Sequence, residues 1–355
     1  TAQNVKRGFV PLDETLGLEK RMSWSPPLKR ILTWLNGKLP YEQASEVVAE
    51  LRGISVPVSS NWRIGQASGQ AIQKVLEAEV EQEKAQAREW STPGGPSSRT
   101  ERMGISMDGA MINIRDEGWK EFKLSVVGQI ECREEQDVMT GDISNYGHIV
   151  KPSYVAHLGG PEEFGWKSWA EAQRRGWDKA RDSVVIGDGA VWIWNQKAEH
   201  FHDSVGIVDW YHATEHLGQA KQAIYPDEGT GATRWLNLQK RDLYLGHTRQ
   251  VAKRIETAAA QVDEPERAAE LRTTAGYFIN NRDRMQYQDF RIDGWPIGSG
   301  TVESAAKQYK LRVTGPGMRW SRTGAYNILA ICSVTLTSPE RFKSVWDQAS
   351  SLPQN

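Results

Sequence analysis

Two short apolar runs, each ending at an aspartate followed by a glycine, constrain the fold of this chain most. One run leads to Asp108 within Gly104–Met111, and the other leads to Asp188 within Val184–Trp192. Apolar runs of this length that stop at a turn signal are typical of buried strands. Glu303 follows a turn rich in glycine and serine and opens an alanine-rich stretch, which predicts a helix. We therefore expect an α/β fold in which two aspartates at strand ends and one glutamate on a helix offer carboxylate ligands.

This ligand set predicts a metal centre. Oxygen-only ligands suit Mg²⁺, with Mn²⁺ as a substitute, and such a set can hold the two ions of phosphodiester chemistry. Each motif also has a plainer interpretation. An Asp-Gly pair after a strand is typical of a hairpin turn, and Glu303, Lys307 and Lys310 at i, i+4 and i+7 can form a solvated face of ion pairs.

Composition excludes a global electrostatic attraction to nucleic acid. The 355 residues carry a net charge of −1, so any DNA contact must come from local basic patches. Cys132 and Cys332 follow no metal-type spacing, which indicates reduced thiols in a cytoplasmic protein. No apolar run approaches about 18 residues and no leader is recognisable, so we expect no membrane partner.

The first hundred residues predict an arm, a helical domain and a connector. Residues 1–25 are irregular. Residues 26–73 carry apolar residues at helical spacing in three pieces, with a glycine-containing turn before the last piece. This outline predicts a helix-turn-helix DNA-binding domain with Arg63 at the DNA, although an ordinary helical bundle has the same pattern. Residues 74–100 predict a charged connector helix followed by a linker over 91–98.

Residues 101–209 predict the first part of an α/β core. Apolar runs separated by glycine-containing turns indicate an antiparallel meander, and later runs that end at Asp-bearing turns indicate buried parallel strands. The expected strands cover 103–107, 110–114, 122–130, 183–186 and 205–208, with an amphipathic helix over 161–181. Three strands, a helix, a strand, a helix and a further strand fit a ribonuclease-H-like sheet.

The rest of the chain predicts helices. Residues 210–295 show no alternating pattern, and about 85 residues are too many for a loop inside a compact domain, so we expect an all-helical insertion. Residues 296–355 are expected to complete the catalytic core with Glu303 and to add C-terminal helices.

An aspartate and two histidines follow the last predicted strand. Asp209 and His212 lie within Asp209–Leu217, and His216 stands one helical turn after His212. Histidines at this spacing can ligate a metal, but a polar pair at a helix end has the same pattern. Because Asp209 also ends a strand, either Asp209 or Asp188 can be the second metal-ligating aspartate.

A basic tract surrounds the glutamate. Residues 300–325 hold five cationic side chains against the single acid Glu303, a local net charge of +4, with a tryptophan and a Gly-Pro-Gly break among them. Basic residues with an interleaved aromatic suit a phosphate backbone and an unstacked base. The nucleic-acid-binding residues expected in this tract are Lys307, Lys310, Arg312, Arg319, Trp320 and Arg322.

The order of these motifs resembles that of the DDE transposases of bacterial insertion sequences, above all the Mutator-like group and its Kra-type family. The resemblance spans residues 26–347 and is carried by Ser106–Ala110, Ile186–Trp194, Asp209–Leu217 and Gly298–Ser321. It implies a ribonuclease-H-like core, an all-helical insertion domain and an N-terminal helix-turn-helix. It also maps the catalytic triad and its metal ligands onto Asp108, Asp188 and Glu303, and a Cys/Asp-x-x-His signature onto Asp209 and His212.

The resemblance also implies a reaction. With Mg²⁺ or Mn²⁺, a water or a DNA 3′-OH attacks phosphorus in line, so that a transposon end is nicked and then joined to target DNA. Asp209 and His212 would position a phosphate or orient a ligand, and Trp210 or Trp320 would stack on a displaced base. The implied partners are double-stranded DNA and a second copy of the chain, at the nucleoid of a bacterial cytoplasm.

Three other classes of protein fit parts of the sequence. A domesticated, catalytically silent DNA-binding protein would use residues 26–73 alone, and the intact acidic triad argues against it. A stand-alone ribonuclease-H-like nuclease would cleave DNA and never join strands. A metal-dependent phosphatase for small molecules is disfavoured by the basic tract and by the predicted helix-turn-helix.

Overall fold

The chain divides into two compact units. The structure, a computed structural model, describes residues 24–89, 101–137, 139, 141–227 and 229–352. The linker expected over 91–98 and all but the last two residues of the expected arm lie outside the described residues. One unit contains residues 1–75 and 321–355, and the other contains residues 76–320. Residues 321–355 therefore belong with the N-terminal helices, whereas the sequence assigned them to the catalytic core.

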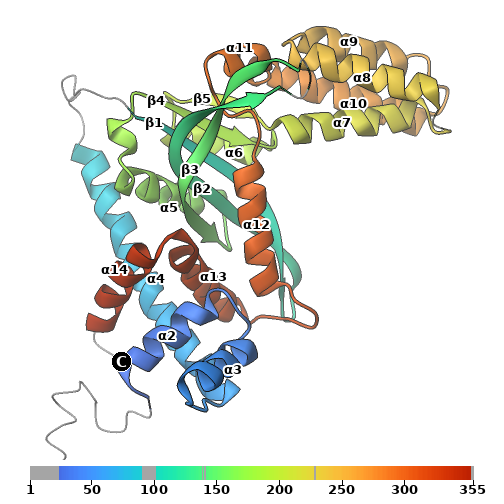
Figure 1. The fold of residues 1–355 in the computed structure, drawn as a ribbon. Helices are drawn as coiled ribbons and strands as arrows, with labels where there is room; N and C mark the ends of the chain where they lie inside the picture. Colours follow the sequence, from blue (N-terminus) through green and yellow to red (C-terminus); the bar gives the residue numbers. More distant parts are fainter. Residues whose placement is uncertain (1–23, 90–100, 138, 140, 228, 353–355) are drawn as a thin grey trace, which may run out of the picture. The chain divides into compact units, whose positions relative to one another are not determined.

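The first unit is a bundle of helices from both ends of the chain (Figure 1). Its elements are α2 (Pro26–Asn36), α3 (Tyr41–Arg52), the N-terminal part of α4 (Val58–Glu89), α13 (Arg322–Thr337) and α14 (Pro339–Ser351). α3 ends at Gly53, whose φ of +65° is the left-handed conformation that favours glycine at a helix end. Leu32, Val48 and Ile64 from the first three of these helices meet in one apolar core.

Helix α13 explains why the C-terminus joins this unit. Its buried residues run almost without interruption from Gly324 to Thr335, and a helix that is apolar around its circumference must be covered on all sides. It lies directly on α4, because a Cβ added at Gly69 would stand 2.7 Å from the Asn327 carbonyl oxygen. Gln73 also donates to the Asn327 side chain at 2.6 Å. The sequence placed a domain boundary between residues 73 and 74, close to the unit boundary between residues 75 and 76, and α4 continues across it to Glu89.

The second unit is built on a mixed five-stranded sheet with the order β3-β2-β1-β4-β5. The strands are β1 (Arg102–Ile114), β2 (Gly118–Gln136), β3 (Ile143–His157), β4 (Asp182–Gly187) and β5 (Val205–Val208). β2 pairs antiparallel with β1 and with β3, while β4 pairs parallel with β1 and β5 pairs parallel with β4. α5 (Pro161–Arg174) and α6 (Val191–His200) connect the parallel strands. The predicted mixed α/β fold and its two late parallel strands are confirmed.

The prediction of two separate strands before residue 115 was wrong. The sequence indicated a turn at Asp108 and Gly109, but β1 runs straight through them, with Asp108 opposite Leu124 and Gly109 opposite Lys123 on β2. A Cβ added at this glycine would meet the Glu121 carboxylate, the movable end of a partly exposed side chain. Asp108 therefore lies inside β1 and not at its end, and β1 and β2 meet in a hairpin at residues 115–117.

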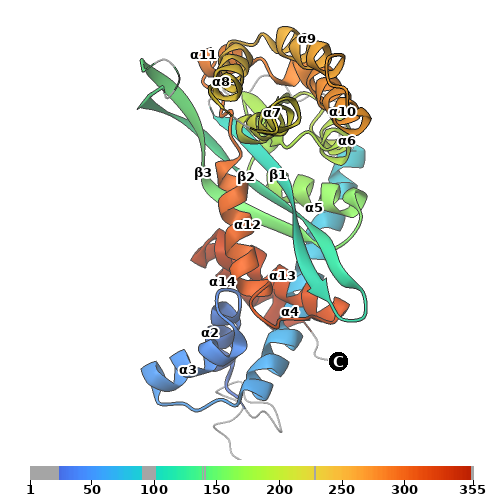
Figure 2. The ribbon, with the colours of Figure 1, turned by 90° about the vertical axis from the view of Figure 1, so that its right-hand side faces the viewer.

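The described residues between 210 and 313 are mainly helical. They form α7 (Trp210–Ile224), α8 (Thr230–Tyr244), α9 (Thr248–Ala259), α10 (Pro265–Asn281), α11 (Tyr287–Ile292) and α12 (Gly300–Val313). Figures 1 and 2 show α7 to α10 gathered at the β4–β5 end of the sheet, and α12 lying along β1 and β2. Leu217, Leu271 and Phe278 of these helices share one apolar core with sheet residues such as Val185 and Ile207. The helical segment is therefore packed onto the sheet. Among the described residues, no helix is both long and apolar enough to cross a membrane.

Candidate metal centre

Three aspartates lie at equivalent register positions of three neighbouring parallel strands, Asp108 within β1 and Asp188 and Asp209 directly after the last residues of β4 and β5. Residues paired between β1 and β4 differ by 80 in number, from Arg102–Asp182 to Ser106–Ile186, and this register sets Asp108 level with Asp188. Residues paired between β4 and β5 differ by 21, which sets Asp188 level with Asp209. Side chains at the same register position of neighbouring strands leave the same face of a sheet. The sheet therefore brings all three carboxylates to one edge, just beyond the paired parallel segments.

Asp209 is fully buried and fixes the start of α7. Its Oδ1 accepts the His212 backbone N–H at 2.8 Å, which makes it the N-cap of the helix. Its Oδ2 accepts the backbone N–H of Ser299. Its own N–H donates to the Gly187 carbonyl at 2.8 Å. This one side chain thus ties the end of β5 to the loop that leads into α12.

Glu303 approaches the same place from α12. It lies in the first turn of that helix, and its Oε1 accepts the Ser299 hydroxyl at 3.2 Å. α12 is held on the sheet by its buried face, where the rings of Tyr309 and Phe122 lie 6.0 Å apart. As a result, ligand atoms of Asp209, His212 and Glu303 lie within 4.8 Å of one another, a spacing that could hold one metal ion.

Asp108 and Asp188 form the other part of the centre. Burial raises the pKa of Asp108, and the charge of Asp188 raises it further, while the N–H of Gly109, His212 and Lys310 lower it. The Asp108 Oδ1 accepts that N–H at 2.7 Å. The Asp188 Oδ1 accepts the Ala190 N–H at 2.8 Å. A half-buried carboxyl beside a second carboxylate is the electrostatic setting that a cation relieves.

Tyr277 supports this edge from the helical segment. Its hydroxyl donates to the Asp188 carbonyl at 2.9 Å, and its ring lies 3.9 Å from the ring of His216. Burial lowers the pKa of His216, and this imidazole is not in the group with Asp209, His212 and Glu303. Gly189 has a φ of +101°, and a Cβ there would stand 2.6 Å from the Tyr277 ring. Sequence reasoning missed Tyr277, which belongs to no local motif, and gave no role to Ser299, although Ser299 lies in the motif that contains Glu303.

The basic tract divides into exposed and buried members. Lys307 and Lys310 are exposed on the face of α12 that carries Glu303. Arg312 is 1% exposed, and its guanidinium lies 5.3 Å above the ring of Trp320, which is also buried. The Trp320 indole N–H donates to the Val313 carbonyl at 2.8 Å. Burial argues against the expected DNA contacts of Arg312 and Trp320, which instead hold the segment after α12 in place.

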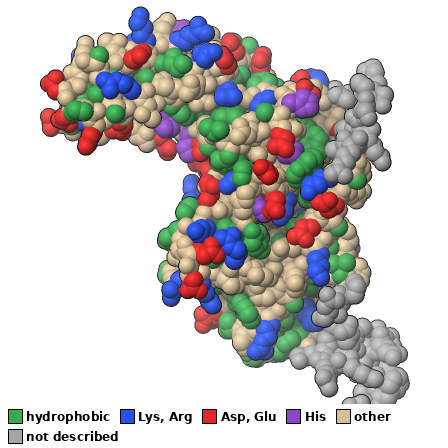
Figure 3. All heavy atoms as spheres, turned by 180° about the vertical axis from the view of Figure 1, so that it is seen from behind, with side chains coloured by type: hydrophobic (Ala, Val, Ile, Leu, Met, Phe, Trp, Pro, Cys, Tyr) green, Lys and Arg blue, Asp and Glu red, His purple; other side chains and the backbone are tan. Residues whose placement is uncertain are grey.

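The other predicted DNA contacts are exposed. Arg319 lines a small polar cleft together with Arg115, Asp116 and Gly317 in the second unit. Arg63 on α4 and Arg322 at the start of α13 are exposed in the first unit. Acidic and basic side chains alternate over the surface that faces the viewer in Figure 3, as expected from the net charge of −1.

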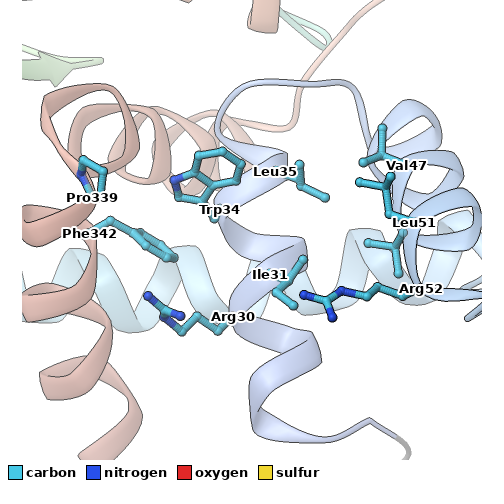
Figure 4. A pocket seen from close by; sticks show the side chains of 10 residues that line it. Arg30, Ile31, Trp34, Leu35, Val47, Leu51, Arg52, Pro339 and Phe342 are labelled. Carbon is cyan, nitrogen blue, oxygen red and sulfur yellow. The ribbon is translucent and has the colours of Figure 1, made fainter.

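The first unit also carries an apolar groove of about 380 Å³. Ile31, Trp34, Leu51 and Phe342 contribute apolar side chains to it, as shown in Figure 4. Arg30 adds a guanidinium that lies 5.8 Å from the centre of the Phe342 ring. The groove has no acidic or histidine lining, so it is not a second metal centre.

Comparisons with known proteins give one distant relationship. No family model matches the chain. It is similar to a protein described as "UPF0236 protein in vanSb 3'region" from Streptococcus gallolyticus, with 21% identity over 330 residues. The alignment covers 92% of this chain and 67% of that protein. The similarity therefore extends over nearly the whole described chain, including both units.

Proposed function

We propose that this chain is a metal-dependent DNA transposase of the DDE class. The observation that carries the proposal is the alignment of Asp108, Asp188 and Asp209 in register at one sheet edge, with Glu303 and His212 close to Asp209. Three antiparallel strands followed by two parallel strands reached through helices support a ribonuclease-H-like core. The helical residues between β5 and α12 then correspond to the insertion that the motif order implies.

Mg²⁺, or Mn²⁺ in its place, fits the donor set because carboxylate oxygens dominate it. We assign Asp108, Asp188 and Glu303 as the ligands. Proximity groups Glu303 with Asp209 and His212, but both Asp209 oxygens already accept backbone N–H groups. Asp209 is better explained as the residue that positions Ser299, and through it Glu303. A bound ion would polarise a phosphate oxygen and lower the pKa of an attacking water or 3′-OH.

His212 lies near both parts of the centre, the group with Asp209 and Glu303 and the pair formed by Asp108 and Asp188. It belongs to the group with Asp209 and Glu303, and its charge also acts on the pKa of Asp108. Its Nδ1 lies 3.2 Å from the Glu215 carboxylate, which fixes the ring orientation. In the proposed reaction His212 faces the scissile phosphate and contributes positive charge or a hydrogen bond there.

DNA contacts come from both units in this proposal. Lys307 and Lys310 are exposed beside Glu303, where a phosphate backbone would pass. In the first unit, α3, the turn at Gly53 and the start of α4 support a helix-turn-helix. Arg63 and Trp62 stand exposed on the second helix of that motif. Action on two transposon ends calls for a homodimer, working at the nucleoid of a bacterial cytoplasm.

A cleavage and joining assay tests the proposal. Purified protein is incubated with labelled element-end DNA and a plasmid target, in Mg²⁺, Mn²⁺ or EDTA. Metal-dependent joined product that disappears in Asp108→Asn, Asp188→Asn and Glu303→Gln is expected. Cleavage without joining would identify a stand-alone nuclease. DNA binding without cleavage in either metal would leave a catalytically silent DNA-binding protein.

A further inference from the structure

Tyr211 is an exposed aromatic side chain at the metal centre. The residue is 59% exposed. Its neighbour Trp210, which was expected to stack on a base, instead packs edge-on against Tyr244 and Tyr287 at 5.1 Å from each ring. Trp320, the other tryptophan expected in that role, is buried. Both tryptophans therefore stabilise the fold, and the ring that solvent reaches beside His212 is that of Tyr211.

The Tyr211 ring is held against the backbone that positions the carboxylates. A Cβ added at Gly298 would stand 3.2 Å from the ring carbon Cε2 and 3.9 Å from Oδ2 of Asp209. The next residue, Ser299, donates its N–H to Asp209 and its hydroxyl to Glu303. The ring and two carboxylates of the centre thus share one short loop as their support. A side chain at position 298 would force the ring to move.

Among the described residues, no hydrogen bond of the Tyr211 hydroxyl supports this arrangement. Within the described part of the chain it forms no hydrogen bond, and the residue is joined to its surroundings through its backbone carbonyl, which accepts the Thr214 hydroxyl at 2.9 Å. Single exposed aromatic residues are common on protein surfaces. This one differs because its ring lies against Gly298, faces solvent and adjoins a centre suited to phosphodiester chemistry.

We propose that Tyr211 forms a nucleobase subsite, in which its ring stacks on the base next to the phosphate held at the metal centre. The inference rests on the proposed function and adds a binding group to it. Stacking on an aromatic ring tolerates any base, because every base has a π face. Such a contact needs the ring and not the hydroxyl, so Tyr211→Phe keeps the subsite and Tyr211→Leu removes it.

The test measures stacking separately from catalysis. The full chain is titrated, in Ca²⁺, into a short DNA duplex whose single-stranded 3′ overhang contains 2-aminopurine, a base whose fluorescence falls when it stacks. Tyr225→Leu is the matched control, since Tyr225 is a half-buried tyrosine directly after the other end of α7. A second duplex has an abasic position in place of 2-aminopurine.

Wild type, Tyr211→Phe and Tyr225→Leu should quench the fluorescence and bind alike. Tyr211→Leu should lose the quench and bind about 5- to 100-fold more weakly. On the abasic duplex the difference between Tyr211→Leu and wild type should vanish. An unchanged quench in Tyr211→Leu, or an equal loss of affinity on the abasic duplex, overturns the inference. Absence of DNA binding by wild type overturns both proposals, whereas quenching without cleavage in Mg²⁺ supports the subsite and contradicts only the transposase.

Discussion

Replacing Gly189 with alanine should destabilise the second unit by about 2–3 kcal/mol. The φ of +101° is a conformation that costs an L-residue about 1–3 kcal/mol. The new Cβ would stand 2.6 Å from the Tyr277 ring, so the ring must move and its 2.9 Å hydrogen bond to the Asp188 carbonyl breaks. That bond contributes about 1 kcal/mol. The lower entropy of unfolded alanine offsets about 0.4–1 kcal/mol of the sum.

A double-mutant cycle in urea separates the two causes. In a Tyr277→Leu background the overlap is relieved and only the backbone strain remains, so Gly189→Ala should cost about 1 kcal/mol less than in wild type. Gly218→Ala is the control, because this helical glycine on α7 has open space around its Cβ position. It should be neutral or stabilise by up to about 1 kcal/mol. A cost below about 0.5 kcal/mol for Gly189→Ala, or an equal cost in both backgrounds, would refute the reasoning.

Three further perturbations follow from particular contacts. Burial and the charges of nearby lysines lower the pKa of His157 to about 4, below the unfolded value of about 6.5. The contribution of His157 to the free energy of unfolding is therefore complete above about pH 6.5, and about 2 kcal/mol of it is lost as pH falls from about 7 to 5. His157→Gln should flatten this pH dependence in urea titrations, whereas His202→Gln, at an exposed site, should not. Asp209→Asn should destabilise the fold by about 1–3 kcal/mol, seen as a lower melting temperature, because the new amide NH₂ would face the Ser299 N–H. Asp188→Asn should melt like wild type. Arg312→Ala should cost about 2–4 kcal/mol through lost packing and leave the DNA affinity of the folded protein, measured by anisotropy, unchanged.

The sequence predicted the parallel strands well because their signal is local. Each is a short apolar run that stops at an aspartate, and the positions of Asp188 and Asp209 after β4 and β5 follow from that pattern. The register that sets Asp108 level with them is a long-range property, which no local pattern contains. The Asp-Gly pair in β1 was misread as a turn because glycine occurs both in turns and within strands.

The basic tract shows that charge alone does not predict which side chains are exposed. The buried face of α12 contains Val302, Ala306, Tyr309 and Val313, and the same helical spacing continues through Arg312. Its position on the helix therefore accounts for its burial, whereas its charge led to the prediction of a DNA contact. Tyr277 could not be predicted as a support of the metal centre, because it lies 89 residues from Asp188 in the chain and meets it only through folding.

The most direct test of the metal centre maps the ion on the folded chain. Fe²⁺ is bound in place of Mg²⁺, and ascorbate with peroxide then generates radicals that cut the backbone beside the ion. Mass spectrometry should find cuts clustered near Asp108, Asp188 and Glu303, suppressed by excess Mg²⁺ and lost in Asp108→Asn. Cuts spread evenly along the chain, or clustered elsewhere and insensitive to that substitution, would contradict the account.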